Sequence, residues 1–283
     1  MKDAKWIVLL LLACAIWGTT FALVKDTLQF FPTFALLAFR FGLAAVLFAI
    51  YIRASGRKVS GSEWKYGTLL GFFLFAYYAT QTWGLNFTTA TNSAFITGIY
   101  VLLVPLLASL VLAKMPQRKI WLAVLMAFVG LYFLSGATGQ FNIGDAVTLL
   151  TAIFVAFQIV YTAKYVHSCD IINLVFVQIL VAAILNFALM LAAGQTPSAY
   201  PLPAIGATVF LAIFGVLFAQ IVQIGAQKRI EPERIALIFL SEPIFAAIFG
   251  FLYLGEMLSP LKAFGAGLML LAMFISIEQR LDV

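Results

Sequence analysis

The sequence predicts an all-α integral membrane protein, with ten transmembrane helices arranged as two inverted five-helix repeats around a central cavity. Hydrophobic residues make up 64% of the 283 residues and charged residues only 10%, against about 25% charged residues in ordinary soluble domains. Long apolar stretches recur along the whole chain. The apolar stretches and some individual residues also recur at a spacing of half the chain length, which indicates that the second five helices repeat the first five.

Ten apolar stretches are long enough to cross a hydrocarbon core of about 30 Å as helices. They cover residues 6–24, 33–52, 65–85, 91–112, 119–135, 144–163, 172–193, 203–226, 235–254 and 260–277. The first continues well past Cys14, which is longer than the apolar region of a secretory signal peptide, so we expect it to remain as a helix. The connections contain turn-forming pieces such as RASGRKVSGS and AAGQTPSAYPLP and leave no room for a soluble domain. Any function must therefore lie within the membrane.

The distribution of Lys and Arg predicts the side of the membrane on which each loop lies, because these residues accumulate in cytoplasmic loops. With the N-terminus inside, the inner loops hold fourteen of the 17 Lys and Arg residues, the outer loops hold Lys25 and Lys262, and Arg40 lies within the second span. Both termini are therefore expected in the cytoplasm, in a multi-pass protein of the cell inner (plasma) membrane. A basic inner face next to anionic lipid explains the net charge of +6, so we expect the lipid bilayer, and no nucleic acid, as a partner.

An internal repeat relates two units, residues 1–141 and 142–283. Gly84 and Gly225 are separated by 141 positions, half the length of the chain. Residue identity between the units is low, and the stronger match is the rhythm of five spans against five. An odd number of spans per unit forces the second unit to cross the membrane in the opposite orientation, as in many secondary transporters whose binding site lies near the midplane.

Two spans carry a proline in their interior. The ninth contains Glu242 and Pro243 in the segment LSEPIFAAIFGFLYLGE, although the interior of a helix in lipid disfavours both a charge and a proline. A helix that ends at about Ser241 and restarts at Pro243 removes the conflict, because proline is tolerated in the first turn and the carboxylate then meets the positive end of the helix dipole. In the fourth span, Pro105 predicts a corresponding interruption. Paired interrupted helices of this kind indicate the binding site of a transporter.

Polar and aromatic side chains recur at helical spacing in several spans and are candidates for lining the cavity. Tyr77 and Gln81 lie on one face of the third span, and Gln220 and Gln223 lie on one face of the eighth. The full set of candidate substrate-binding residues is Trp17, Tyr77, Tyr78, Gln81, Asn92, Ser93, Thr97, Tyr100, Gln158, Tyr161, Gln220 and Gln223. The alternative is that such residues hydrogen-bond between packed helices, as polar side chains also do in bilayers. For Trp17, cavity lining and packing are equally open.

Four residues are candidates for coupling or gating: Glu242, Pro243, Pro105 and Arg40. Arg40 lies roughly 10 Å below the outer end of the second span, at a rise of about 1.5 Å per residue. Its side chain could extend to the interface, bind a substrate carboxylate or form a salt bridge. Glu242 could bind a proton in competition with a solute, or it could serve only as a cap of the second helix piece.

The segments AIWGTTFALVK, AFRFGLAAVLF, TTATNSAFITGIYVLLVPLL, LSEPIFAAIFGFLYLGE and GAGLMLLAMFIS together extend over essentially the whole chain. They resemble the drug/metabolite transporter (DMT) superfamily, in its EamA-type ten-helix family. The resemblance implies two five-helix repeats around a central cavity, and transport of amino acids or other small metabolites, often outward. The Glu-Pro segment that ends in LGE, in the ninth span, is its most specific part.

These observations predict a secondary transporter of small organic solutes such as amino acids or related metabolites, working as an exporter, with proton coupling left open. An importer or an uncoupled facilitator is the alternative, followed by a membrane enzyme or scaffold without transport. We expect no enzyme activity, cofactor or metal, because the chain has no Gly-rich phosphate loop and its single histidine, His167, forms no ligand cluster with Cys14 and Cys169. The sequence leaves the oligomeric state and the particular solute unspecified.

Overall fold

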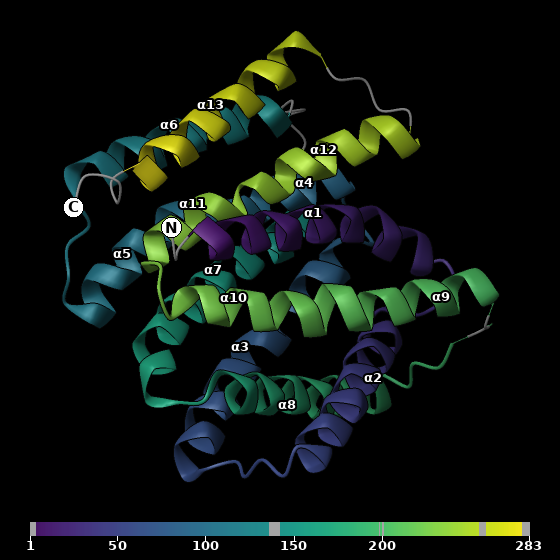
Figure 1. Ribbon diagram of the computed structural model, residues 1–283. Helices are drawn as coiled ribbons and strands as arrows, with labels where there is room; N and C mark the ends of the chain where they lie inside the picture. Colours follow the sequence, from purple (N-terminus) through teal and green to yellow (C-terminus); the bar gives the residue numbers. More distant parts are fainter. Residues whose placement is uncertain (1–3, 136–141, 198, 200, 255–258, 279–283) are drawn as a thin grey trace.

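The structure is a computed structural model of the chain, and it describes residues 4–135, 142–197, 199, 201–254 and 259–278. Within these residues every regular element is helical, and Figure 1 shows long helices packed across one another. Six helical stretches, some of which join adjacent helices, are long and apolar enough to cross a membrane, and they cover Ala4–Thr27, Thr33–Ala54, Ser93–Leu112, Ile143–Ser168, Ile171–Ala192 and Leu202–Gln227. The predicted class, an all-α membrane protein, is confirmed.

Short connections join the helices in sequence order. The first half holds α1 (Ala4–Thr27), α2 (Thr33–Ala54), α3 (Gly61–Gly84), α4 (Ala90–Gly98), α5 (Tyr100–Leu112) and α6 (Arg118–Ser135). The second half holds α7 (Ile143–Tyr165), the short 3₁₀ helix η1 (Val166–Ser168), α8 (Ile171–Ala192), α9 (Leu202–Phe210), η2 (Leu211–Phe218), α10 (Ala219–Gln227), α11 (Pro232–Phe239), α12 (Ser241–Leu254) and α13 (Pro260–Glu278).

Capping residues fix where two of the helices begin. Ser60 and Glu63 form a reciprocal capping box at the start of α3, and Asn142 and Asp145 form another at the start of α7. In each box the side chains satisfy backbone N–H groups that the first helical turn leaves unpaired. The Asp145 carboxylate also accepts a hydrogen bond of 2.5 Å from the Thr88 hydroxyl, which ties the start of α7 to the turn between α3 and α4.

The ninth predicted span is broken, as the Glu-Pro pair indicated. α11 ends at Phe239 and α12 begins at Ser241, so the break lies at Leu240, just before the predicted end of the first piece. Glu242 and Pro243 occupy the first turn of α12, where a proline removes no helical hydrogen bond. The confirmed break therefore places a carboxylate at the N-terminal end of a helix inside the protein.

The interruption of the fourth span does not lie at Pro105, where the sequence predicts it. α4 ends at Gly98 and α5 begins at Tyr100, while Pro105 lies inside α5. At the break, the N–H of Ile99 donates to the carbonyl of Ile96 at 3.2 Å, which is a tighter turn than an α-helix makes. The prediction was wrong in position because proline disturbs the turn before it, and the weak helix former Gly98 lets the chain break there.

The breaks of the fourth and ninth spans correspond in position. Ile99 and Leu240 are separated by 240 − 99 = 141 residues, the spacing that the sequence predicts for a repeat. They also lie close together, because a methyl group added at Gly98 would be only 3.2 Å from the Leu240 side chain. The two interrupted helices therefore cross near their breaks.

The eighth predicted span contains an irregularity that the sequence analysis did not foresee. Its middle third, η2, is a π-helix between α9 and α10, with one residue more per hydrogen-bonded turn than an α-helix. Gly215 lies within this wide segment. Such π-helical turns are frequently found at functional sites, so the surroundings of Gly215 are of interest.

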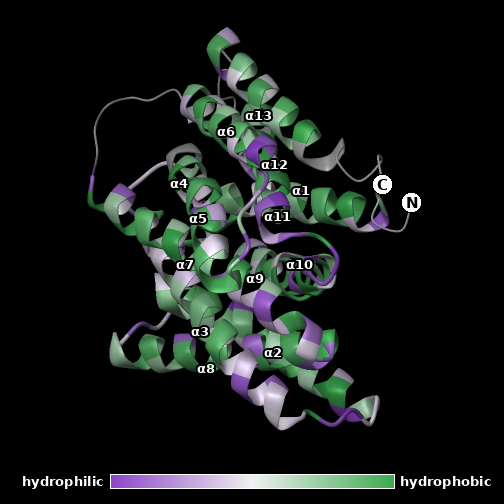
Figure 2. Cartoon of the chain, turned by 90° about the vertical axis from the view of Figure 1, so that its left-hand side faces the viewer, coloured by the Kyte–Doolittle hydropathy of each residue, from purple (hydrophilic) through white to green (hydrophobic). Residues whose placement is uncertain are grey.

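Helices from the two halves of the sequence pack against each other throughout. α1 packs against α10 and α12, α3 against α7 and α8, α2 against α8, and α6 against α13, a pair that lies at one edge in Figure 1. Figure 2 shows that hydrophobic residues make up most of the length of the helices, as expected for transmembrane helices. A methyl group at Gly71 of α3 would approach the Gln178 carbonyl of α8 to 2.9 Å, so glycine permits this close packing.

Candidate functional site

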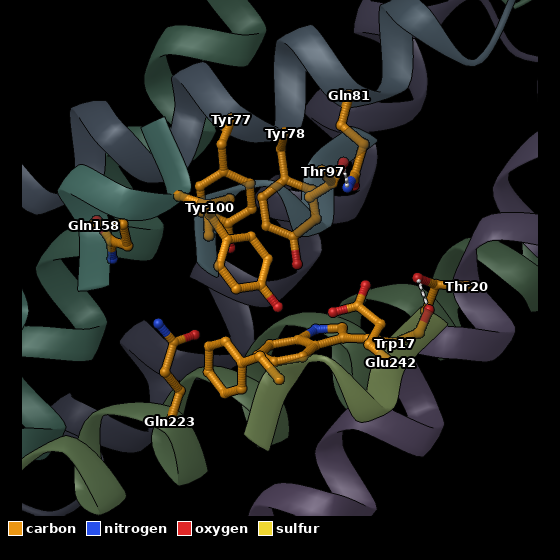
Figure 3. A pocket seen from close by; sticks show the side chains of 12 residues that line it. Trp17, Thr20, Tyr77, Tyr78, Gln81, Thr97, Tyr100, Gln158, Gln223 and Glu242 are labelled. Atoms are coloured by element: carbon orange, nitrogen blue, oxygen red, sulfur yellow. Dashed lines mark hydrogen bonds between the residues drawn. The ribbon is translucent and has the colours of Figure 1, made fainter. Parts of the chain in front are cut away.

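A polar pocket, hereafter the central pocket, lies between helices from both halves of the sequence and has a cavity volume of about 40 Å³. Its lining consists of Trp17, Thr20, Tyr77, Tyr78, Gln81, Thr97, Tyr100, Val155, Gln158, Gln223, Phe239 and Glu242. In Figure 3 the residues of α3 and α5 face those of α1, α10 and α12 across the pocket. Aromatic walls with a few polar groups are typical of sites that bind small organic molecules.

Most of the residues predicted from the sequence meet at this pocket. Eight of the candidate substrate-binding residues line it, namely Trp17, Tyr77, Tyr78, Gln81, Thr97, Tyr100, Gln158 and Gln223, together with the coupling candidate Glu242. Gln220 lies directly behind the lining, because its side-chain amide donates to the Tyr77 hydroxyl at 3.2 Å. Asn92 belongs to α4, but its side chain lies outside the described part of the structure.

Two other candidates do not line the central pocket. Tyr161 packs into an aromatic cluster, with its ring 5.7 Å from that of Phe73 and 6.0 Å from that of Tyr165. The pocket lining on α7 passes through Val155 and Gln158 and does not include Tyr161, so a role of Tyr161 in substrate binding stays a prediction. Ser93 is fully buried one turn before Thr97, and its hydroxyl has no hydrogen-bond partner in the described structure.

Glutamine side chains form a chain of hydrogen bonds that leads away from the pocket along α10. Gln220 donates to Gln223 at 3.4 Å, Gln223 donates to Gln227 at 3.4 Å, and Gln227 donates to the Ile159 carbonyl at 2.9 Å. Both sequence interpretations therefore apply to this stripe. Gln223 faces the pocket, whereas Gln220 and Gln227 join helices to one another, as polar residues do in lipid.

Gly215 holds two pocket residues in place, and the sequence analysis missed it. Its carbonyl accepts a hydrogen bond of 3.0 Å from the Trp17 indole and one of 3.2 Å from the Tyr78 hydroxyl. The indole N–H of Trp17 thus has the partner that a buried tryptophan requires. No sequence signal identifies this role, because the acceptor is a backbone atom and the segment around it, LAIFGVLF, has no polar side chain.

Glu242 faces the central pocket from the first turn of α12. Its side chain is half-buried, and in the described structure it forms neither an ion pair nor a hydrogen bond. Close packing of α1 and α12 sets its position, since a methyl group at Gly18 would approach the Glu242 carbonyl to 3.1 Å. Figure 3 shows the carboxylate above Trp17 and directed toward the tyrosines of α3. An unpaired carboxylate in an apolar protein interior is costly, so this position calls for a proton or a cationic partner.

Arg40 lies inside the protein rather than at the membrane interface. It is only 2% exposed, so the interpretation that its side chain extends to the interface is wrong. The guanidinium lies 4.6 Å from the centre of the Tyr78 ring and 3.5 Å from the Tyr78 hydroxyl, and its Nε has no hydrogen-bond partner. None of the ion pairs in the described residues includes Arg40 or Glu242, so the two do not form the salt bridge considered from the sequence. The prolines Pro105 and Pro243 are buried and do not line the pocket.

A second pocket lies beside the connection between α10 and α11 and carries several charges. Lys114 forms an ion pair with Glu231 at 2.5 Å, and Arg234 lies 3.7 Å from the same carboxylate. The hydrogen bond to Glu231 raises the pKa of Lys114, whereas burial raises the pKa of Glu233. Among the residues that the structure describes, no three His, Cys, Asp or Glu side chains lie close enough to hold a metal ion.

An all-helical membrane fold with a polar pocket between its helices is the arrangement of a membrane transporter. The chain belongs to the EamA-like transporter family, which matches residues 4–136 and again residues 142–277. This membership confirms the resemblance to the drug/metabolite transporter superfamily, and it points to a transporter rather than an enzyme.

Relatives agree with this assignment. An uncharacterized transporter of Archaeoglobus fulgidus is 35% identical over 94% of this chain and 83% of its own length. The uncharacterized transporter YyaM of Bacillus subtilis is 26% identical over 96% of this chain and 93% of its own. A solved crystal structure with a TM-score of 0.80 and 18% identity covers 99% of both chains, so it shares the fold.

Proposed function

We propose that the protein is a secondary transporter of small organic solutes, such as amino acids or related metabolites, and that it exports them through the central pocket. One observation carries the proposal: the unpaired Glu242 carboxylate faces a pocket of aromatic and amide side chains where two interrupted helices cross. Amide and hydroxyl groups supply donors and acceptors for a polar solute, and the aromatic rings cover its apolar part. The outward direction rests on the family resemblance.

We propose further that ten spans form two inverted repeats, residues 1–141 and 142–283. When α4 is counted with α5, α9 with η2 and α10, and α11 with α12, the helices form ten spans, five in each half of the sequence. If each span of a contacting pair is replaced by its counterpart in the other unit, five spans away, the result is again a contacting pair. The contact of α1 with α12 then corresponds to that of α7 with α5, and the contact of α3 with α7 corresponds to that of α10 with α1. The pairs α2 with α8 and α6 with α13 correspond to themselves. Two successive matches to the same family also support the repeat.

The two glycines of the sequence repeat have corresponding surroundings. A methyl group at Gly84, at the end of α3, would approach the Gly144 carbonyl at the start of α7 to 2.9 Å. A methyl group at Gly225, near the end of α10, would approach the Trp6 ring at the start of α1 to 2.4 Å. In each case the end of the third span of one unit packs on the first span of the other, as an inverted repeat requires.

Proton coupling at Glu242 belongs to the same proposal. The titratable groups that face the pocket with it are Tyr77 and Tyr78 of α3 and Tyr100 of α5, and Arg40 lies behind Tyr78. A proton or a cationic solute would each neutralise the carboxylate, so their binding would be competitive and would allow exchange. The rival interpretation keeps Glu242 permanently charged as a helix cap, stabilised by the dipole of α12.

The proposed orientation places both termini in the cytoplasm of the cell inner (plasma) membrane. It follows from the bias of Lys and Arg toward one side. Membrane-impermeant thiol reagents applied to whole cells should label a cysteine introduced at Thr196 and should not label one introduced at Ser55. Labelling of Ser55→Cys alone would reverse the orientation.

Flux measurements with purified protein in lipid vesicles test the transport proposal. Radiolabelled neutral amino acids should cross the membrane of vesicles that contain the protein faster than that of protein-free vesicles. The same solutes should raise the melting temperature of the protein, because a ligand stabilises the state it binds. Net movement toward the face that is extracellular in cells would support export. Movement in the opposite direction, or equal movement both ways without a gradient effect, would favour the importer or the uncoupled facilitator instead.

A further inference from the structure

Arg40 has fewer partners than a buried guanidinium requires. Arginine has five N–H donors and remains charged, and a charge within a transmembrane region is costly unless it is paired. Among the described residues, the only hydrogen bond of the Arg40 side chain is the long contact of 3.5 Å to the Tyr78 hydroxyl, and its Nε has none. The Tyr78 ring at 4.6 Å offers a cation–π contact but not a counter-charge. None of the carboxylates among the described residues forms an ion pair with Arg40.

The surroundings of Arg40 are shaped to hold its guanidinium next to the central pocket. A methyl group at Gly215 would lie 2.8 Å from the Arg40 terminal nitrogen, so the glycine leaves the room that the guanidinium occupies. The Gly215 carbonyl also binds Trp17 and Tyr78, both of which line the pocket. The Tyr78 side chain contacts the guanidinium and also lines the pocket, and Figure 3 shows its hydroxyl pointing into the space beside Glu242.

We propose that Arg40 makes the central pocket selective for solutes that carry a carboxylate, by drawing that group to the Tyr78 end of the pocket. The positive charge attracts an anion strongly because few polar groups around it screen the interaction. Glu242 lies at the same end and accepts a cationic group, so a solute with a carboxylate and an amine on neighbouring atoms satisfies both charges. The remainder of the solute then extends toward Tyr100, Val155 and Phe239. Arg40 acts through Tyr78 and is a positioning residue.

This inference rests on the proposed transport of small organic solutes through the central pocket, and paired probes test it. L-leucine and L-phenylalanine carry a carboxylate, whereas L-leucinamide and L-phenylalaninamide replace it by a neutral amide of the same size. Binding to the purified wild-type protein, measured by calorimetry and by thermal stabilisation, should favour each acid over its amide by about tenfold or more, the loss of one charge-assisted interaction. In Arg40→Gln the ratio should fall to near one, chiefly through weaker binding of the acids.

Two further variants separate selectivity from folding. Arg40→Lys keeps a positive charge and should retain part of the preference for the acids, whereas Arg118→Gln removes an exposed arginine and should retain all of it. Equal binding of acids and amides by the wild-type protein would overturn the inference even if Arg40→Gln failed to fold. An unchanged acid-to-amide ratio in folded Arg40→Gln would also overturn it, while leaving the transport proposal intact. If none of the four probes binds the wild-type protein, both the proposed transport of amino acids and the proposed role of Arg40 in selecting them are contradicted.

Discussion

The indole N–H of Trp17 donates a hydrogen bond of 3.0 Å to the carbonyl oxygen of Gly215, which lies 198 residues further along the chain. This bond joins α1 to the π-helical segment η2 at the wall of the central pocket. The Tyr78 hydroxyl donates to the same carbonyl, so one backbone atom orients two pocket side chains from different helices. Changes at Gly215 should therefore alter solute binding without removing any polar side chain.

Gly215→Ala is expected to weaken solute binding by about tenfold, equivalent to the loss of one interaction of about 1.5 kcal/mol. The added methyl group would lie 2.8 Å from the Arg40 terminal nitrogen, so the guanidinium must move. Gly206→Ala is the matched control, because a methyl group there meets no atom within 4 Å. Calorimetric titration of both variants checks the prediction, and equal affinities for the two would contradict it.

Gln81→Ala and Gln223→Ala should each reduce transport by about fivefold or more, if each amide makes a hydrogen bond of about 1 kcal/mol to the solute. Both side chains line the central pocket, and Gln81 has only a long contact of 3.4 Å to the Thr97 hydroxyl. Initial rates in proteoliposomes provide the measurement, with exposed Gln117→Ala as the control. Wild-type flux and wild-type solute-induced stabilisation in both pocket variants would show that these glutamines serve only to pack helices.

Gly71→Ala should destabilise the protein by about 1–3 kcal/mol, the usual cost of overfilling a packed interior. The methyl group would approach the Gln178 carbonyl of α8 to 2.9 Å and the Val181 side chain to 2.7 Å. Gly42→Ala, where a methyl group meets nothing within 4 Å, should be neutral or more stable by up to about 1 kcal/mol, because alanine favours helix. Thermal unfolding in detergent compares the two, and similar melting temperatures would refute the close packing of α3 on α8.

Glu63, just before the predicted third span, makes stability depend on pH. Burial alone would raise the pKa of its carboxyl, but hydrogen bonds from the backbone N–H groups of Ser60 at 2.6 Å and Asp170 at 3.0 Å outweigh burial, and the net pKa is lowered. The carboxylate therefore stabilises the folded state above its unfolded pKa of about 4.3, and this contribution is lost as the pH falls through the lower folded value. Glu63→Gln should melt a few degrees below wild type at pH 7, and the difference should shrink as the pH falls below about 4.3 and vanish once the pH is below the lowered folded pKa. A difference that is constant with pH would contradict this account.

The parts of the site that the sequence predicts are those that side-chain chemistry reveals. Glu242 next to Pro243 is so unfavourable inside a continuous helix in lipid that a break is predicted, and polar stripes indicate Gln81 and Gln223. The break at Ile99 is harder to predict, because the glycine before it, Gly98, is also common inside unbroken transmembrane helices, and Pro105 is the stronger local signal. Gly215 is hidden, because a backbone carbonyl acquires its role only through the packing of α1 and α3 on η2.

Arg40 illustrates a third limit of sequence reasoning. Its depth in the second span is readable from the sequence, but its long side chain can reach either the interface or the interior. The direction is set by Gly215, which leaves space for the guanidinium, and by the Tyr78 ring against which it packs. Both partners are distant in sequence, so only the folded structure determines the choice.

Solute exchange and gradient-driven flux by Glu242→Gln test the account most directly, because glutamine keeps the size of the side chain but cannot ionise. If Glu242 binds a proton in competition with the solute, proteoliposomes with the variant should exchange solute across the membrane yet show no acceleration by an imposed pH gradient, which should accelerate flux through the wild-type protein. The folded state of the variant is verified by its melting temperature and its elution as a single species. Gradient-driven flux at the wild-type rate in folded Glu242→Gln would contradict the account and leave Glu242 as a helix cap.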